Sequence, residues 1–204
     1  MGKIKINGSA KKEFKADVMR VDISISTAGE TSASAINKGK KETEKVLQLL
    51  ADLGFELSKV SMEKDRVSNP SRYDDKYYHF EKEISFTSSA NLALLESISD
   101  GLIKNEINAT YDEAFYLSDI ESAKKAVLQD ALLDSKKKAE IIAETLGQKV
   151  VGIESAKCDE YREDAESERL YMCCEQERPV SLAAMLSPDT ISVDRSIDVT
   201  WNIE

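Results

Sequence analysis

The stretch from Asp17 to Thr27 constrains the fold more than any other part of the chain. Its apolar side chains alternate with polar or charged ones, and the apolar positions are Met19, Val21, Ile23 and Ile25. A period of two residues is typical of a β-strand whose sheet has one buried and one solvated face. The chain must therefore provide partner strands for this segment and a layer of structure that covers its apolar face.

Helical periodicity follows this strand and recurs later in the chain. Apolar residues recur at helical spacing from Ile36 to Leu53, after a possible cap at Thr31 or Ser32 and before a stop at Gly54. Asn91 can cap a shorter helix. The longest helix is predicted to begin after Ser118 or Asp119 and to end near Gly147, and its expected apolar stripe is Ile120, Ala123, Val127, Ala131, Ala139, Ile142 and Leu146.

The complete predicted order is β-β-α-β-β-α-β-α-β-loop-β, and residues 17–118 alone give the β-α-β-β-α-β order of a ferredoxin-like fold. We therefore predict an α+β protein: an antiparallel sheet with helices on one face, a ferredoxin-like split β-α-β core, and an additional long helix and strands. The longest helix is expected on the apolar face of the same sheet. Residues 1–204 are expected to form one domain, with a mobile excursion at about 161–189, where charges and prolines accumulate.

Composition excludes several classes of function. The 204 residues carry a net charge of −10, which argues against a general nucleic-acid binder. No apolar run approaches the length of about 20 residues that a membrane-spanning helix needs. The chain has one histidine, which excludes a multi-histidine metal site, and it lacks the glycine-rich phosphate-binding motifs and H-E-x-x-H. We predict no cofactor, no metal, no nucleic-acid partner and no membrane span.

Three charged residues interrupt the apolar faces of predicted strands. Lys82, Glu113 and Arg195 each lie in phase with the apolar side chains of their own strand. An unpaired buried charge is costly, so each must pair, reach past the edge of a helix, or be redirected by a bulge. The functional interpretation is a polar seam that lines a pocket or channel, and the alternative is a strand end or bulge. We predict that Glu113 pairs with a basic side chain, first Arg195 or Lys82.

A predicted hairpin tip carries tyrosines and aspartates, which makes it a candidate contact surface or a simple solvated turn. Its residues are Tyr73, Asp74, Asp75, Tyr77 and Tyr78. Tyrosine is enriched at protein interfaces. The two aspartates offer too few oxygen ligands at regular spacing for a calcium loop.

The cysteines form an odd set, Cys158, Cys173 and Cys174. An odd count with two adjacent members does not fit a disulfide framework, and it favours reduced thiols in the cytoplasm. Without a recognisable export signal the expected location is cytoplasmic, or extracytoplasmic if such a signal has been removed. The three thiols are candidate redox groups, whereas loop cysteines without a function are the simpler interpretation. His79, out of phase with its apolar neighbours, is expected to face solvent or a partner.

Several short stretches, read together, resemble the SIMPL-domain family, which includes bacterial periplasmic immunogenic proteins. They are Ile6-Asn7-Gly8, Ala35-Ile36-Asn37-Lys38, Leu50-Ala51-Asp52-Leu53-Gly54-Phe55, Phe115-Tyr116-Leu117-Ser118-Asp119, and Ala131 followed by Lys138-Ala139-Glu140-Ile141-Ile142-Ala143-Glu144-Thr145-Leu146-Gly147. The resemblance spans nearly the whole chain. It implies a protein of unsettled biochemical role, since members are linked to oxidative-stress tolerance or to signalling complexes and some form ring-like homo-oligomers.

From the resemblance and the residues we expect a non-enzymatic, self-associating protein that acts through protein–protein contacts in stress tolerance or signalling, and therefore a homo-oligomer. Long strands with free edges must be paired or protected, which is consistent with self-association. The alternative is a small thiol-dependent or hydrolytic enzyme on the same scaffold. That alternative requires a pocket that converges on Cys158, Cys173, His79 or paired carboxylates.

Overall fold

The computed structural model describes residues 2–70, 76–158 and 190–204, and it confirms an α+β fold built from antiparallel sheets. The helices and strands are β1 (Gly2–Lys15), β2 (Val18–Gly29), α1 (Ser32–Asp52), the 3-10 turn η1 (Leu57–Lys59), β3 (Ser61–Ser68), β4 (Tyr78–Ser89), α2 (Leu92–Lys104), β5 (Ala109–Tyr116), α3 (Ile120–Thr145), β6 (Val150–Cys158) and β7 (Thr190–Ile203). The predicted excursion at 161–189 lies outside the described residues.

The chain divides into two compact units. Among the described residues, the continuous unit comprises Asp17–Tyr116, and the discontinuous unit is built from 2–16, 117–158 and 190–204. The sequence analysis expected one domain for residues 1–204. The division into two compact units does not test that expectation, which stays a prediction.

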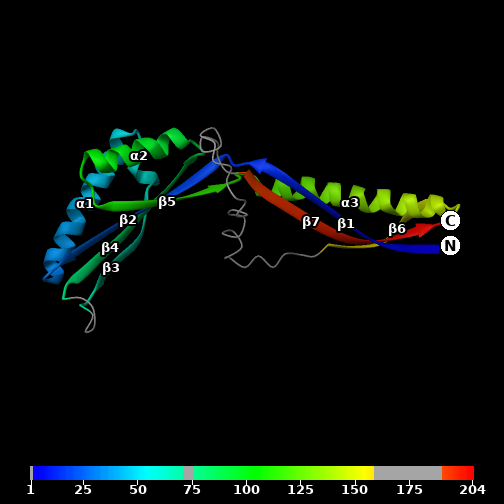
Figure 1. Cartoon of the computed structure of the whole chain (residues 1–204), viewed down its shortest axis with the longest axis horizontal. Helices are drawn as coiled ribbons and strands as arrows, with labels where there is room; N and C mark the ends of the chain where they lie inside the picture. The colour runs from blue at the N-terminus through cyan, green and yellow to red at the C-terminus, as the bar shows by residue number, and fades with distance from the viewer. Residues whose placement is uncertain (1, 71–75, 159–189) are drawn as a thin grey trace. The chain divides into compact units, whose positions relative to one another are not determined.

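The continuous unit has the predicted ferredoxin-like topology. Its four-stranded sheet has the order β3-β4-β2-β5, and every neighbouring pair is antiparallel. Figure 1 shows α1 and α2 together on one face of this sheet. Under them lies an aliphatic core that includes Met19, Ile23, Leu50, Ile84 and Ile98, each at most 1% exposed.

Both helices of the continuous unit begin at the caps that the sequence predicted. The Thr31 hydroxyl accepts a hydrogen bond from the Ser34 amide at 3.1 Å, and the Asn91 side chain accepts one from the Ala93 amide at 3.1 Å. Gly54, with φ of 87°, follows α1 in the left-handed conformation that glycine adopts most easily.

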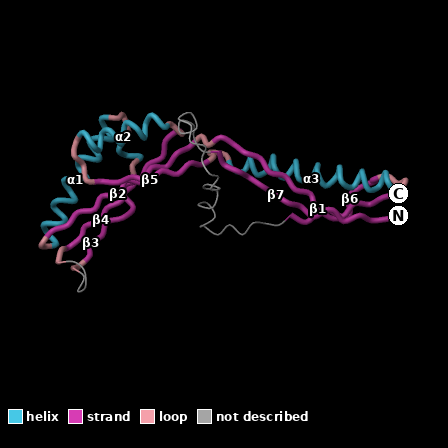
Figure 2. The backbone as a smooth tube through the Cα atoms, in the orientation of Figure 1, coloured by secondary structure: helices cyan, strands magenta, loops and turns pink. Residues whose placement is uncertain are grey.

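The discontinuous unit corrects the expected position of the longest helix. Strands β1, β7 and β6 form a separate three-stranded sheet in that order, and α3 packs on this sheet rather than on the ferredoxin-like one. Figure 2 shows α3 running alongside these three strands. The described strands therefore form two sheets, because β1 takes β7 as its partner along its whole length, from Gly2–Ile203 to Lys15–Thr190.

The buried face of α3 also differs from the predicted stripe. Its buried residues recur at every fourth position and are mostly small: Ala123, Val127, Ala131, Ser135, Ala139 and Ala143. Small side chains let the helix approach the sheet closely, and a Cβ on Gly8 of β1 would lie only 2.1 Å from the carbonyl oxygen of Ala131. Ile142 and Leu146, which we expected on the buried stripe, are 39% and 64% exposed.

Candidate functional site

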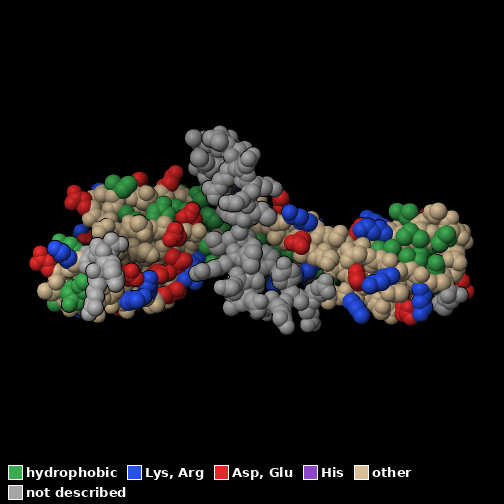
Figure 3. Space-filling view, turned by 60° about the horizontal axis from the view of Figure 1, so that its bottom comes forward, with side chains coloured by type: hydrophobic (Ala, Val, Ile, Leu, Met, Phe, Trp, Pro, Cys, Tyr) green, Lys and Arg blue, Asp and Glu red, His purple; other side chains and the backbone are tan. Residues whose placement is uncertain are grey.

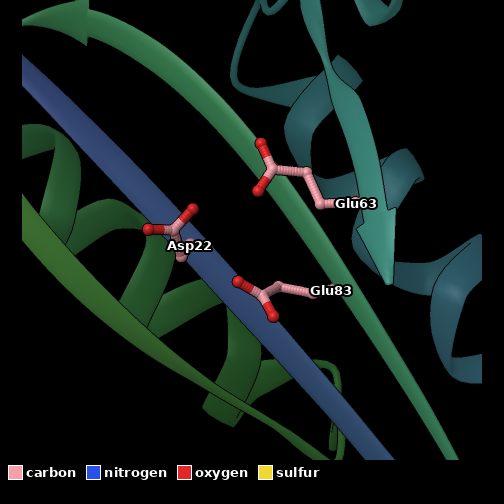
Figure 4. Close-up of side chains that lie close together, drawn as sticks. All are labelled: Asp22, Glu63 and Glu83. Carbon is pink, nitrogen blue, oxygen red and sulfur yellow. The ribbon is translucent and has the colours of Figure 1, made fainter. Parts of the chain in front are cut away.

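Three carboxylates converge on the face of the four-stranded sheet that lies opposite the helices. Asp22 comes from β2, Glu63 from β3 and Glu83 from β4, and Figure 4 shows the three side chains gathered from adjacent strands. Their nearest oxygen atoms lie within 4.8 Å of one another. Glu63 reaches this face because a bulge shifts the pairing of β3 with β4 between Met62 and Lys64.

Arg20 binds two of these carboxylates. Its Nε donates to Asp22 Oδ1 at 2.9 Å and its terminal nitrogen donates to Glu63 Oε2 at 2.7 Å. Ser85 Oγ also donates to Glu63 Oε1 at 2.8 Å, and this hydrogen bond, followed by that from Arg20, lowers the pKa of Glu63. The hydrogen bond with Asp22 is the largest cause that raises the pKa of the Arg20 guanidinium.

Oxygen ligands at this spacing are those that Mg²⁺ or Ca²⁺ prefers, but Arg20 already satisfies two of the three carboxylates. Within residues 2–70, 76–158 and 190–204, no ion pair joins Glu83 to a basic side chain. Asp112 of β5 lies directly opposite Asp22 in register, so a fourth carboxylate adds to the negative charge. The arrangement is therefore an ion-pair network with excess negative charge.

On the other face of the same sheet, a groove of about 220 Å³ separates α1 from β3 and β4. Its lining residues are Ile36, Lys40, Thr43, Glu44, Asp65, Val67, Phe80 and Lys82. Phe80, 3% exposed, and Thr43, 8% exposed, are its buried residues. Lys82 Nζ donates to Asp65 Oδ2 at 3.1 Å, so an ion pair and an apolar surface lie side by side in the groove.

The predicted polar seam stays a prediction, and the structure places two of its residues differently. Lys82 lies toward the helix-covered face, as its phase predicted, and its side chain is 14% exposed. Glu113 is exposed, and across the described residues it has no ion pair with a basic side chain. The reason is that β5 is an edge strand, where a charge can reach water past the covered face.

The fold of the continuous unit does not bring Lys82 and Glu113 together. Lys82 pairs with Asp65 instead of Glu113. In the sheet, β2 lies between β4, which carries Lys82, and β5, which carries Glu113. Arg195 is half-buried in β7, which belongs to the discontinuous unit.

The other candidates are only partly described. Tyr73, Asp74 and Asp75 of the hairpin tip lie outside the described residues, as do Cys173 and Cys174. Tyr77 is 46% exposed just before β4, and Tyr78 is its half-buried first residue.

Cys158 and His79 belong to different units. Cys158 is the exposed last residue of β6. His79, in β4, lies opposite Ala28 of β2. It is out of phase with Phe80, as predicted, and it is half-buried. The described helices include none that is long and apolar enough to span a membrane.

Sequence reasoning missed the Arg20 network. Arg20 and Asp22 were visible as the wet-face residues of an alternating strand, but Glu63 and Glu83 join them only through the strand order. A charged residue two positions from an opposite charge on a strand is the local signal that could have found the pair.

Comparison with known families gives one match that covers nearly the whole chain. The profile of the SIMPL family, described as "Protein of unknown function (DUF541)", matches residues 4–201. No curated protein matches the chain.

Among solved structures, one similar chain is that of a "putative aminohydrolase" from methicillin-resistant Staphylococcus aureus, with 8% identity and a TM-score of 0.26. The match covers 52% of this chain and 30% of that protein. A similarity at this level carries no argument about function.

Proposed function

The chain belongs to the SIMPL family, whose function is unknown, and from that premise we propose that it acts by self-association and protein contacts rather than by catalysis. The observation that carries this proposal is an exposed apolar surface on the discontinuous unit. We name it the terminal patch: Ile141, Ile142, Leu146, Val151 and Ile153.

The terminal patch collects large apolar side chains in one short stretch of chain. Ile141 and Leu146 are each 64% exposed, and Val151 and Ile153 are 49% and 47% exposed. The stretch covers the end of α3 and the start of β6, and Figure 3 shows hydrophobic side chains gathered at this end of the discontinuous unit. Large exposed apolar side chains concentrated in one region are typical of protein interaction sites.

The strand beside the patch is open to pairing as well. β6 is an edge of the sheet β1-β7-β6, and its pairing with β7 shifts register twice. β1, the opposite edge, carries lysines such as Lys3, Lys5 and Lys11, which protect an edge from unwanted pairing. The β1 edge carries lysines, whereas the β6 edge adjoins the terminal patch. Strand β6 is therefore the candidate contact surface.

The alternative, a thiol-dependent or hydrolytic enzyme, would need a pocket at Cys158, at His79 or at paired carboxylates. The groove beside α1 is lined by neither Cys158 nor His79. The three clustered carboxylates lie on the opposite face of the sheet, where Arg20 neutralises two of them. These features support self-association and protein contacts rather than catalysis. The proposed biological setting of these contacts is stress tolerance or signalling.

The test is the mass of the protein in solution, measured by light scattering and sedimentation over a wide range of concentrations. We expect a homo-oligomer, and we expect the double substitution Ile141→Glu and Leu146→Glu to shift the mass toward that of a monomer. Leu133→Glu is the matched control, because Leu133 is 54% exposed on the same helix but lies outside the patch. A wild-type monomer at every concentration would refute the proposal.

A further inference from the structure

Among the residues that the structure describes, strand β3 is an edge of its sheet, and no described strand pairs with its outer side. It is the first strand in the order β3-β4-β2-β5, and seven of its eight residues are exposed. Two of them are large and apolar, Met62 at 53% and Val67 at 39% exposure. An edge with free backbone groups and exposed apolar side chains is a template for another strand.

The sequence of β3 is complementary to its own reverse. When the strand runs antiparallel to a second copy centred between Lys64 and Asp65, each residue meets a suitable partner. The pairs are Ser61 with Ser68, Met62 with Val67, Glu63 with Arg66, and Lys64 with Asp65. The Met62–Val67 pair joins apolar side chains, and the Glu63–Arg66 pair joins opposite charges.

Moving the centre by half a residue in either direction destroys this match. Glu63 would then lie opposite Asp65, or Lys64 opposite Arg66, and like charges would repel. The charge pattern thus disfavours the two nearest alternative registers.

The bulge of β3 makes the complementary register compatible with the two faces of the sheet. Met62 and Val67 lie opposite Ile84 and Phe80 of β4, so both lie on the helix-covered face. In a regular strand, two residues five positions apart point to opposite faces, and the bulge between Met62 and Lys64 removes that mismatch.

The polar pairs follow the same logic. Glu63 contacts Arg20 and Ser85 on the open face, where Arg66 lies opposite Glu81. Ser61 and Ser68 share this face, so only the central pair, Lys64 with Asp65, is split between the faces. In this register the bulged residue Glu63 of each copy lies opposite Arg66 of the other copy, so the two bulges lie on either side of the two-fold axis.

Strand β5, the other edge of the same sheet, is not complementary to its own reverse. The middle of β5 is Asp112-Glu113, so self-pairing about its centre would place two carboxylates opposite each other. Self-complementarity is therefore a property of β3 and not of edge strands in this sheet generally.

The groove beside α1 can receive an apolar side chain from the second copy. Val67 lines this groove together with Phe80 and Lys82. In the complementary register, Met62 of the second copy lies next to Val67 on the same face. Methionine is long and flexible and fills irregular apolar spaces well.

We propose that β3 pairs antiparallel with β3 of a second copy about a two-fold axis between Lys64 and Asp65, and that Met62 of each copy enters the groove of the other. This inference rests on the proposed self-association and names one of its interfaces. The interface joins the two four-stranded sheets edge to edge, and two-fold symmetry makes every contact occur twice.

The test uses charge reversals in complementary pairs, measured by sedimentation equilibrium. Arg66→Glu and Glu63→Lys each place like charges together twice, so each variant alone should weaken the β3 contact about tenfold or more. An equimolar mixture of the two variants restores opposite charges at both positions and should recover the association. Glu113→Arg, a reversal at the exposed edge β5, is the matched control and should leave the mass unchanged.

Recovery in the mixture separates a lost interface from a damaged fold, because two misfolded chains do not rescue each other. If Glu63→Lys fails to fold, the same experiment is carried out with Met62→Lys and Val67→Glu, because Met62 and Val67 lie on the same face and meet across the proposed interface. A wild-type chain that is monomeric throughout overturns both proposals. A wild-type oligomer whose mass is unchanged by Arg66→Glu, or variants that do not recover on mixing, overturn the β3 interface alone.

Discussion

The two units bury their apolar surface in different ways. In the continuous unit, large aliphatic side chains from β2, β4, α1 and α2 interlock, and residues such as Ile23 and Leu50 are fully buried. In the discontinuous unit, one long helix presents a row of small residues to the sheet, and the larger apolar residues at its end stay exposed.

This difference shows how close packing can rest on either side-chain volume or backbone proximity. The first kind of core gains from the area that each side chain removes from water. The second gains from the close approach of helix and sheet, which Gly8 permits. The two units should therefore respond to different substitutions, and Trp201, the single tryptophan, reports on the discontinuous one.

The largest expected effect is that of Leu50→Ala in the continuous unit. Removing a fully buried leucine should lower the free energy of unfolding by about 2–5 kcal/mol, from lost transfer energy and the cavity left behind. The measurement is denaturant unfolding followed by circular dichroism and by Trp201 fluorescence in parallel. We expect the fluorescence midpoint to shift less than the dichroism midpoint. Equal shifts would contradict separate units and support the predicted single domain.

The next effect is expected from Gly8→Ala in the discontinuous unit. The added Cβ would collide with the Ala131 carbonyl and the Ser135 side chain, so α3 must move away from β1. We expect a loss of about 1–3 kcal/mol, seen as a lower midpoint of Trp201 fluorescence. Gly152→Ala in β6 is the control, since a Cβ there meets nothing within 4 Å. Equal stability of the two variants would argue against close packing at Gly8.

Smaller effects should follow loss of the helix caps. Asp119 accepts a hydrogen bond from the Ser122 amide at 2.9 Å at the start of α3, as Thr31 does at the start of α1. Asp119→Ala and Thr31→Ala should each cost about 1 kcal/mol. Asp119→Ala should act on the fluorescence transition and Thr31→Ala on the dichroism transition. If Asp119→Ala shifted the dichroism transition and Thr31→Ala the fluorescence transition, the result would contradict the description of the two units as separate.

The smallest expected effect concerns pH. A hydrogen bond from Asn7 at 2.9 Å, followed by the contact with Lys5, lowers the pKa of Asp198 below its ordinary value of 3.8. A lowered carboxylate pKa adds stability above that ordinary value, and the contribution is lost as the pH falls through the native pKa. Asn7→Ala should therefore raise the pKa of Asp198, measured by NMR titration. An unchanged titration would remove Asn7 as the cause.

Local signals predicted the elements well because they act within a few residues. The alternation in Asp17–Thr27 became β2, and the caps Thr31, Asn91 and Asp119 all accept the expected amide hydrogen bonds. The ferredoxin-like order followed from these elements, because few topologies satisfy that sequence of strands and helices.

The second sheet was missed because it depends on pairing between distant segments. β1 could have joined the main sheet as far as its pattern showed, and only its pairing with β7 excludes this. The row of alanines on α3 also gave a weak signal, since alanine fits both a buried and an exposed helix face.

The candidate sites were predictable to a similar, limited degree. The phase of Lys82 in its strand placed it correctly toward the helices, because phase is a local property. The exposure of Glu113 depended on β5 being an edge, and the Arg20 network depended on β4 alone separating β2 from β3. Both facts belong to strand order, which no single segment encodes.

The pairing of β1 with β7 determines when each part of the protein can fold during synthesis. The ribosome completes all strands of the continuous unit by Tyr116, whereas Gly2–Lys15 must wait for Thr190–Ile203. Until then a long strand with apolar residues on one face remains without its partner in the nascent chain. The lysines along β1 keep this waiting strand soluble, so they serve the protein before the native fold exists as well as after.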